Sequence, residues 1–309
     1  MRGKGMALSQ LNGLVVVDKP KGPTSAGCLK KMKHVLGQKK IGHAGTLDPM
    51  ATGVLLALLG QGTKLAPYLA GGDKIYSGKL RLGVATDTYD MEGAVISEAS
   101  FEHLRPQDVR DEVGAWKDLR KQEVPPISAA KHQGVPLYAL ARAGRTVPVK
   151  VKSIRISHAE CLSVDLPWVR FRVRCAAGTY IRSLVHSLGT RLGCGAVLTE
   201  LTREQCLPFG LEQAHELDRL LNEPERFRDR VIPLREALPH WSRLILAKDL
   251  AEQVRNGAWL NVDQALAPGL TGAPGERAFF FSSEKRPLAL VESRQKHGRT
   301  RWAILRGFW

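Results

Sequence analysis

The chain has 309 residues, of which 43% are hydrophobic and 25% are charged. This mixture excludes a wholly disordered protein, and the length favours two domains or one large domain with an appendage. Lysine and arginine number 46 against 30 acidic residues, a net charge of +16. Such an excess favours a polyanionic partner such as nucleic acid over a surface charged only for solubility.

Hydrophobic patterns predict short strands and helices over roughly the first 240 residues. Strands are expected where apolar residues run together or alternate with polar ones, and helices where a capping residue precedes the pattern and a glycine follows it. The expected strands are Leu14–Val17, Gly53–Leu59, Ile75–Leu82 and Val169–Cys175. The expected helices are residues 25–36 (capped by Thr24 and ended by Gly37), 63–69 (capped by Thr63), 106–113, 137–143 and 180–192.

The character of the sequence changes around Pro233–Pro239, where we expect a domain boundary. Beyond it the pattern predicts one helix and three strands joined by tight polar turns. These elements are the helix 248–255 and the strands 278–282, 287–291 and 300–305. We therefore predict a larger domain of residues 1–238 and a small, mostly β module of residues 239–309.

The N-terminal residues and the cysteines bear on where the protein works. Arg2 and Lys4 are not followed by an apolar stretch, so no signal peptide is predicted. The longest apolar run, residues 54–59, is too short to cross a bilayer. The five cysteines have no C-x-x-C spacing, which predicts free thiols and no metal site. We expect a cytoplasmic protein with no membrane contact.

The positive charge gathers in two blocks. Residues 1–40 hold nine basic residues and one acidic residue, and residues 120–155 hold eight and one. Residues 81–116 instead hold three basic and eight acidic residues. Proline and glycine punctuate residues 125–152, here called the basic segment, and predict a loop-rich structure. Two basic blocks around an acidic stretch are more typical of two surfaces that hold a polyanion from two sides than of a single charged face exposed to solvent.

The segment Gly42–Gly53 is the strongest candidate for chemistry. It places His43, Thr46 and Asp48 between glycines, just before a predicted buried strand. A tight loop on a rigid strand is a common position for catalytic groups. From composition alone, a turn-forming role for Asp48 is favoured, because Asp-Pro is a common turn dipeptide, and a structural role is favoured for His43.

Two other segments are weaker candidates. Gly60–Lys64 lacks the spacing of a phosphate-binding P-loop. The acid pair Asp87 and Asp90 is more typical of a solvated loop than of a metal site. A hydrolase that uses carboxylates would need a second acid or a metal beside Asp48, and the sequence shows no motif for either.

Several separate motifs together resemble one family. They are VDKPKGPTS (17–25), GHAGTLDPMATG (42–53), GQGTK (60–64), KIY (74–76), GVATDTYD (83–90), PPIS (125–128), GTYIRSL (178–184) and LGCGA (192–196). In this order, over residues 11–215, the chain is similar to the TruB family of bacterial tRNA pseudouridine synthases, which act on uridine 55 in the T arm. It departs at Ser187 and Thr202, where the family usually has aspartate and arginine.

The resemblance implies a fold, a reaction and a partner. The implied fold is mixed α/β (α+β), with a mixed, largely antiparallel central sheet flanked by helices and a small C-terminal PUA-like β-barrel that binds RNA. The implied activity is that of an isomerase, an intramolecular transferase that needs no cofactor because the reaction is redox-neutral. The implied partner is the T stem-loop of tRNA, bound by a monomer with no protein partner.

The resemblance also implies roles for single residues. Asp48 would be the essential carboxylate, as a nucleophile or as a stabiliser of cationic character on the sugar, with Arg182 holding it bidentately. Tyr76 would stack on the flipped base and act in proton transfer. The remaining expected contacts are Tyr180 and Leu201 in the pocket, His43 in the space that the flipped base leaves, and Lys19, Lys64, Lys131, Arg142 and Arg145 on the RNA.

A second hypothesis is an RNA-binding or RNA-folding protein that does not use the pocket. The charge and the C-terminal module fit both hypotheses. The set of Asp48, Tyr76 and Arg182 favours the enzyme, because a protein that only binds phosphates has no need of a buried carboxylate.

Overall fold

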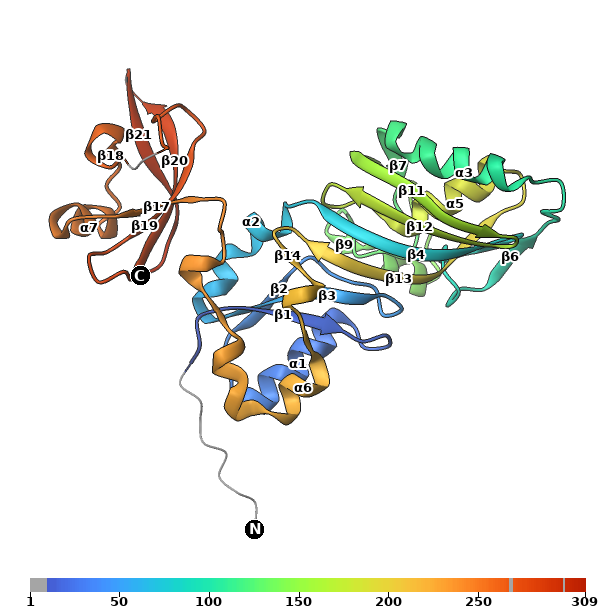
Figure 1. The fold of residues 1–309 in the computed structure, drawn as a ribbon, viewed down its shortest axis with the longest axis horizontal. Coiled ribbons are helices and arrows are strands. Elements are labelled where there is room, and N and C mark those ends of the chain that lie inside the picture. The colour runs from blue at the N-terminus through green and yellow to red at the C-terminus, as the bar shows by residue number, and fades with distance from the viewer. Residues whose placement is uncertain (1–9, 267–268, 297) are drawn as a thin grey trace, which may run out of the picture.

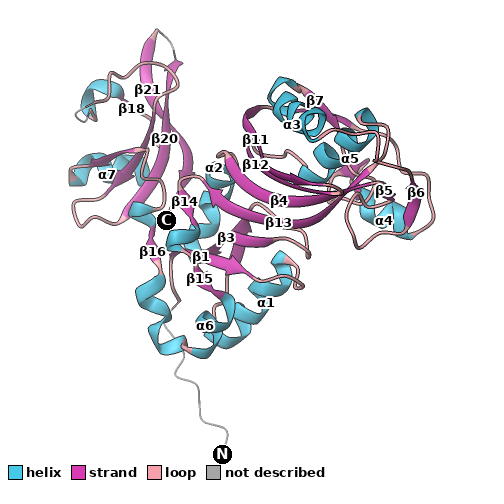
Figure 2. Cartoon of the chain, turned by 45° about the vertical axis from the view of Figure 1, so that its right-hand side comes forward, coloured by secondary structure: helices cyan, strands magenta, loops and turns pink. Residues whose placement is uncertain are grey.

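The computed structural model describes residues 10–266, 269–296 and 298–309. Its centre is a ten-stranded sheet whose main path runs β11-β12-β4-β13-β3-β1-β15 (Figures 1 and 2). The pairs β13/β3 and β1/β15 are parallel and the other pairs are antiparallel, as the expected fold class requires. The strands are β1 (Gly13–Lys19), β2 (Ile41–Ala44), β3 (Thr52–Leu59), β4 (Lys74–Leu82), β11 (Ile156–Asp165), β12 (Trp168–Cys175), β13 (Ala196–Cys206), β14 (Phe209–Gly210), β15 (His215–Glu216) and β16 (Ile232–Pro233).

The helices α3 (Pro106–Gly114) and α5 (Ile181–Arg191) lie on one face of this sheet (Figure 1). The predicted alternation in β12 is confirmed, because Val169, Phe171 and Val173 are buried and the arginines between them are exposed. Trp116 of the short helix η2 (Ala115–Asp118) packs edge-to-face on Phe171, with ring centroids 5.1 Å apart. Burial against helices on one face leaves the arginine face of the strand open to solvent.

The N-terminal elements confirm the expected capping and correct one prediction. In α1 (Ser25–Leu36), the Thr24 side chain accepts the Gly27 N–H, and Gly37 ends the helix with φ +59°. Thr63 does not cap a helix, because residues 60–70 form a 3-10 turn, η1 (Gly60–Leu65), followed by α2 (Ala66–Ala70). The Thr63 hydroxyl instead donates to the Gly60 carbonyl inside η1.

The basic segment connects, along the chain, two strands that pair in a small sheet, β7 (Lys121–Glu123) and β10 (Val151–Ser153). It contains a minimal hairpin, β8 (Lys131–His132) and β9 (Val135–Pro136), followed by α4 (Leu137–Arg142). Its hydrophobic core is small and consists of Val124, Leu137 and Leu140. The acidic stretch before it carries the hairpin β5 (Val84–Thr86) and β6 (Val95–Glu98).

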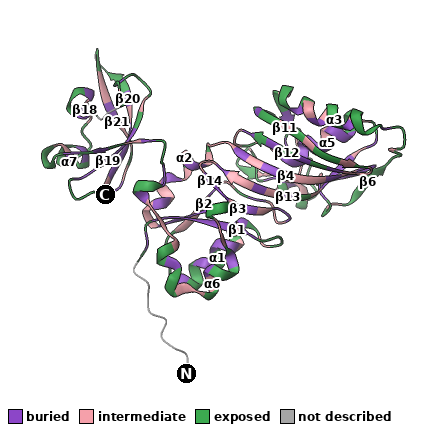
Figure 3. Cartoon of the chain, in the orientation of Figure 1, coloured by how far each residue is buried: buried purple, intermediate pink, exposed green. Residues whose placement is uncertain are grey.

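A second, five-stranded sheet with the order β17-β19-β20-β21-β18 lies at the other end of the chain (Figure 1). It has its own core around Phe280 and Trp302, and it contacts the central sheet through Phe279 and Phe281. Figure 3 shows buried residues along its strands and exposed residues on α7. Its elements are β17 (Ser242–Ile245), α7 (Lys248–Arg255), β18 (Leu260–Asn261), η6 (Val262–Gln264), β19 (Arg277–Phe281), β20 (Pro287–Lys296) and β21 (Arg299–Gly307). Along the chain, the segment from β14 to β17 also contains η3 (Leu211–Gln213), α6 (Leu217–Asn222), η4 (Pro224–Arg230) and η5 (Leu234–Glu236).

This arrangement explains the uninterrupted apolar runs in β1 and β3. Val15 and Leu55 face the core under α1, whereas Val16 and Leu56 face the core shared with the second sheet. A strand buried on both faces has no polar side to alternate with. No helix among the described residues is long and apolar enough to span a membrane.

Candidate functional site

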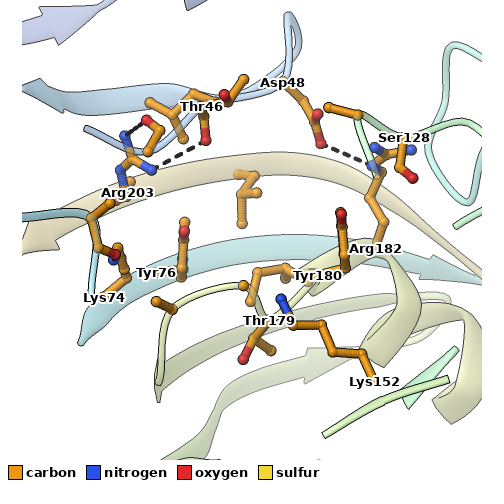
Figure 4. A pocket seen from close by; sticks show the side chains of 18 residues that line it. Thr46, Asp48, Lys74, Tyr76, Ser128, Lys152, Thr179, Tyr180, Arg182 and Arg203 are labelled. Carbon is orange, nitrogen blue, oxygen red and sulfur yellow. Dashed lines mark hydrogen bonds and ion pairs between the residues drawn. The ribbon is translucent and has the colours of Figure 1, made fainter. Parts of the chain in front are cut away.

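A cavity of about 440 Å³ opens on the sheet face that carries α5 (Figure 4). Segments distant in the sequence meet around it: the loop before β3, strands β4 and β13, the start of α5, and the basic segment. Five of the predicted site residues line this cavity, namely Asp48, Tyr76, Tyr180, Arg182 and Leu201. Lining residues that the sequence analysis gave no role include Thr46, Lys74, Ser128, Lys152 and Arg203.

The loop that carries Asp48 is fixed by buried contacts on both sides. Ser25 at the start of α1 accepts the Leu47 N–H at 2.8 Å and donates to the Leu47 carbonyl at 3.0 Å. Gly53 has φ +96°, and a Cβ atom there would lie 2.3 Å from the carbonyl oxygen of Arg203. The glycine is therefore required both by its backbone conformation and by the close approach of β13.

Lys19 secures the same loop from within the protein. Its side chain is fully buried, and its ammonium donates to the carbonyls of Pro20, Pro49 and Ala51 at 2.9, 3.2 and 2.7 Å. Burial lowers the pKa of Lys19. This position corrects the expected phosphate contact, because the ammonium is buried and its hydrogen bonds go to three backbone carbonyls.

Arg182 forms an ion pair with Asp48 at one end of the cavity, as Figure 4 shows. Its Nε donates to Oδ2 of Asp48 at 2.9 Å. The Arg182 side chain is 7% exposed and that of Asp48 is 39% exposed. A buried guanidinium thus holds a carboxylate that faces the open cavity.

The contact between Asp48 and Arg182 is not the expected bidentate one. Arg182 uses Nη1 on the Thr88 carbonyl at 2.8 Å, and both Nη atoms lie 3.3 Å from the Ile127 carbonyl. These carbonyls engage both outer nitrogens, and Asp48 is bound through Nε alone. The five donors of a guanidinium allow this arrangement, and a lysine has no equivalent fork.

Asp90 is a site residue that the sequence analysis missed. Its Oδ2 lies 3.6 Å from Nε of Arg182, and its side chain is 7% exposed. Oδ1 accepts hydrogen bonds from the Thr88 hydroxyl at 2.6 Å and the Glu92 N–H at 3.1 Å. The solvated-loop interpretation of Asp90 is therefore wrong. The motif GVATDTYD, which ends at this residue, is the signal that could have revealed it.

Tyr76 and Arg203 form the floor at the opposite end of the cavity. Burial raises the pKa of Tyr76 to about 12, with the positive charge of Arg203 partly offsetting the effect. Arg203 is 1% exposed and donates to the carbonyls of Gly45, Thr46 and Val54. Tyr76 therefore remains a neutral phenol at physiological pH, which makes it a hydrogen-bond donor and a stacking surface and not a strong base.

Two other predicted residues lie outside this cavity. His43 is half-buried on β2, just before the Asp48 loop, and its Nδ1 has no hydrogen-bond partner among the described residues. Burial and the charge of Arg203 lower its pKa, so the imidazole is neutral near pH 7. Lys64 points toward the C-terminal sheet, where its ammonium donates to the Gly307 carbonyl at 2.7 Å and lies 5.5 Å from the ring centroid of Phe308.

The predicted RNA contacts of the basic segment lie on its surface. Lys131, Arg142 and Arg145 are exposed and do not line the cavity. Arg142 stacks over the Tyr138 ring, 5.7 Å from its centroid. Ser128 and Lys152 bring the segment itself to the cavity wall. The segment thus presents charge to solvent on a structure that also closes one side of the cavity.

Metal-binding side chains are not grouped in the part of the chain that the structure describes. No cluster of three or more His, Cys, Asp or Glu residues there could hold a metal ion. All five cysteines are free thiols, four of them buried. The cavity itself presents the carboxylate of Asp48 beside the guanidinium of Arg182, the neutral phenol of Tyr76 and the apolar side chain of Leu201.

Comparison with known proteins places these features in context. Residues 33–181 match a family described as "TruB family pseudouridylate synthase (N terminal domain)". The chain is 56% identical to tRNA pseudouridine synthase B of Nitratidesulfovibrio vulgaris (Hildenborough) over 97% of this chain and 99% of that protein. It is 45% identical to the protein of the same name from Geobacter sulfurreducens, over 80% and 82% of the two chains.

Solved structures share the fold at lower identity. A chain in the crystal structure of the archaeal box H/ACA sRNP Nop10-Cbf5 complex superposes with a TM-score of 0.70 at 23% identity, covering 96% of this chain and 86% of that one. A chain in a Cbf5-Nop10-Gar1 complex gives the same TM-score at 25% identity, covering 96% and 85%. The similarity in fold therefore extends over both sheets.

Proposed function

Because this chain belongs to the TruB family of pseudouridine synthases, we propose that it isomerises uridine 55 in the T arm of tRNA to pseudouridine. The observation that carries the proposal is the pair of Asp48 and Arg182 at the mouth of a cavity of about 440 Å³. Relatives named tRNA pseudouridine synthase B that match over nearly the whole chain support tRNA as the substrate.

The cavity supports a reaction on a single flipped base. Its volume is that of a small-molecule site, and its walls combine the apolar Leu201 with the phenol of Tyr76. A base inside a folded loop is stacked and out of reach, so the nucleotide must leave the stack before it enters. His43, neutral and just before the Asp48 loop, is our candidate for filling the vacated space.

The chemistry is an isomerisation in which all atoms are retained. The bond between N1 of the base and C1′ of the sugar breaks, the base turns, and a bond between C5 and C1′ forms. The proton on C5 is lost and N1 gains one, so no oxidant or reductant is needed. Asp48 acts either as a nucleophile or by stabilising positive charge on the sugar, and both roles use its carboxylate form.

The rest of the chain supports binding to RNA. The basic segment carries the exposed cations Lys131, Arg142 and Arg145, and it also forms part of the cavity wall. The same segment can therefore contact phosphates and border the reacting base. We further propose that residues 239–309 form a PUA-like RNA-binding domain and that the protein acts as a monomer in the cytoplasm. Phosphate contacts would make tRNA affinity fall as salt rises.

The test is conversion of an unmodified tRNA transcript by the purified protein, without added cofactor. We expect a product of unchanged mass whose pseudouridine maps to position 55, and no product from a transcript that has cytidine there. Pseudouridine at other positions only would contradict the site specificity. Tight tRNA binding without any conversion would favour an RNA-binding or RNA-folding protein instead.

A further inference from the structure

Gln122 connects the base of the basic segment to the start of α5. It lies on β7, is 8% exposed, and bonds to one residue at both ends of its amide. Its Oε1 accepts the Tyr180 N–H at 2.7 Å, and its Nε2 donates to the Tyr180 carbonyl at 3.1 Å. Two hydrogen bonds from one buried amide to the backbone N–H and carbonyl of one residue fix both its position and its orientation.

Tyr180 connects the cavity lining to the start of α5. It immediately precedes α5 and lines the cavity, and Arg182 follows two positions later in the first turn of the helix. The ring of Tyr180 also packs against the small core of Val124, Leu137 and Leu140. The basic segment and its base therefore hold Tyr180 by its backbone and by its side chain.

Open space adjoins both β7 and α5. A cavity of about 460 Å³ there is lined by Lys121 of β7 and by Ser183, His186 and Ser187 of α5, with Leu119 beside them. The amide of Gln122 is a polar link between β7 and the start of α5. A second link is direct, since the Ile127 carbonyl of the basic segment lies 3.3 Å from both Nη atoms of Arg182.

From this geometry we propose that Gln122 is a positioning residue. Its hydrogen bonds link the position of the basic segment to the positions of Tyr180 and Arg182. The cavity is therefore complete only when the basic segment is packed against the start of α5. The proposal rests on the proposed function. Gln122 lies beneath the RNA-facing surface, so its loss affects the chemical step and leaves tRNA affinity largely intact.

The variant that tests this is Gln122→Leu, which keeps the approximate size of the side chain and removes both hydrogen bonds. The matched control is Gln107→Leu, because Gln107 is exposed on α3 and does not line the cavity. At saturating tRNA we expect the single-turnover rate of Gln122→Leu to fall on the order of ten- to a hundredfold, the loss that small misplacements of catalytic groups produce. The dissociation constant for tRNA should stay within about threefold.

A second variant guards against simple misfolding. Gln122→Glu retains an oxygen that accepts the Tyr180 N–H and loses the donor to the carbonyl, so its rate should lie between wild type and Gln122→Leu. Thermal melting checks that each variant is folded. Rates equal to the Gln107→Leu control in both Gln122 variants would overturn the proposal, as would a loss of affinity that accounts for the whole loss of activity.

A double-mutant cycle shows whether Gln122 acts through Arg182. In an Arg182→Lys background, Gln122→Leu should lower the rate by less than about threefold, since the group that it positions is already gone. The same fold-loss in both backgrounds would contradict the proposed route. Failure here is distinct from failure of the proposed function, because wild type must first convert uridine 55; if it does not, the function itself is wrong.

Discussion

Arg182 and Asp90 form a buried ion pair behind the accessible carboxylate of Asp48. Nε of Arg182 lies 3.6 Å from Oδ2 of Asp90, and each side chain is 7% exposed. The guanidinium thus stands between two carboxylates, one sealed inside the protein and one open to the cavity. Asp90 compensates the buried positive charge and helps to fix the plane in which Arg182 meets Asp48.

Replacing Asp90 with asparagine should slow the reaction by about tenfold or more and leave tRNA affinity unchanged. The amide keeps the shape of the side chain but leaves the buried guanidinium with only Asp48 as an anionic partner. Single-turnover kinetics at saturating tRNA measure the effect. Asp87→Asn is the control, because Asp87 lies in the same turn and accepts the backbone N–H of Ala94. Equal rates for the two variants would show that Asp90 has no part in placing Arg182.

Arg182→Lys should be impaired more severely than Asp90→Asn. An ammonium cannot satisfy the carbonyls of Thr88 and Ile127 while it also reaches Asp48 in the geometry of a planar fork. The same single-turnover assay, with tRNA affinity measured in parallel, checks this. A rate like that of wild type would mean that a positive charge alone suffices at this position.

The periodic elements of the fold are those that the sequence predicts well. The arginine alternation of β12 and the caps of α1 follow from local patterns and appear as expected. The same patterns do not reveal β11 and β13, each of which has two register shifts that interrupt the alternation of its side chains. In these two strands the interrupted alternation hides the strand from a search for local periodicity.

At the site, motif positions predict which residues gather but not how they bond. Asp48, Tyr76 and Arg182 meet at one cavity, whereas the burial of Lys19 and the partnership of Lys64 with Gly307 depend on contacts that no spacing encodes. The role of Asp90 likewise requires pairing with a residue far along the chain. The sequence alone does not show whether a charged side chain binds a carbonyl of the protein or a phosphate of the RNA.

Neutralising Lys131, Arg142 and Arg145 together should weaken tRNA binding and flatten its dependence on salt. Each lost phosphate contact removes roughly 0.7 to 0.9 units from the slope of log affinity against log salt. The measurement is the dissociation constant over a salt series for wild type and the triple variant, with thermal melting to show that the fold survives. An unchanged slope in a folded variant would mean that these side chains are only solvated.

The buried phenol of Tyr76 makes stability depend on pH in the alkaline range. Its pKa is raised from 10 to about 12, so the unfolded chain releases this proton first as the pH rises. The buried, protonated phenol of Tyr76 contributes to the free energy of unfolding. This contribution is fully present below pH 10 and is lost between about pH 10 and 12. Its upper limit is roughly 3 kcal/mol. Tyr76→Phe lacks this term, so the stability advantage of wild type over the variant should shrink from pH 9 to pH 11. Denaturant unfolding across that range checks this, and a difference that does not vary with pH would contradict the burial of an ionisable phenol.

The most direct test of the account is Asp48→Asn, assayed for pseudouridine at position 55 and for tRNA binding in the same preparation. Asparagine has nearly the same shape and still meets Arg182, but it has no negative charge to attack or stabilise the sugar or base. We predict that conversion is abolished while tRNA affinity stays within several-fold of wild type. Turnover at the wild-type rate by a folded Asp48→Asn protein would contradict the account at its centre.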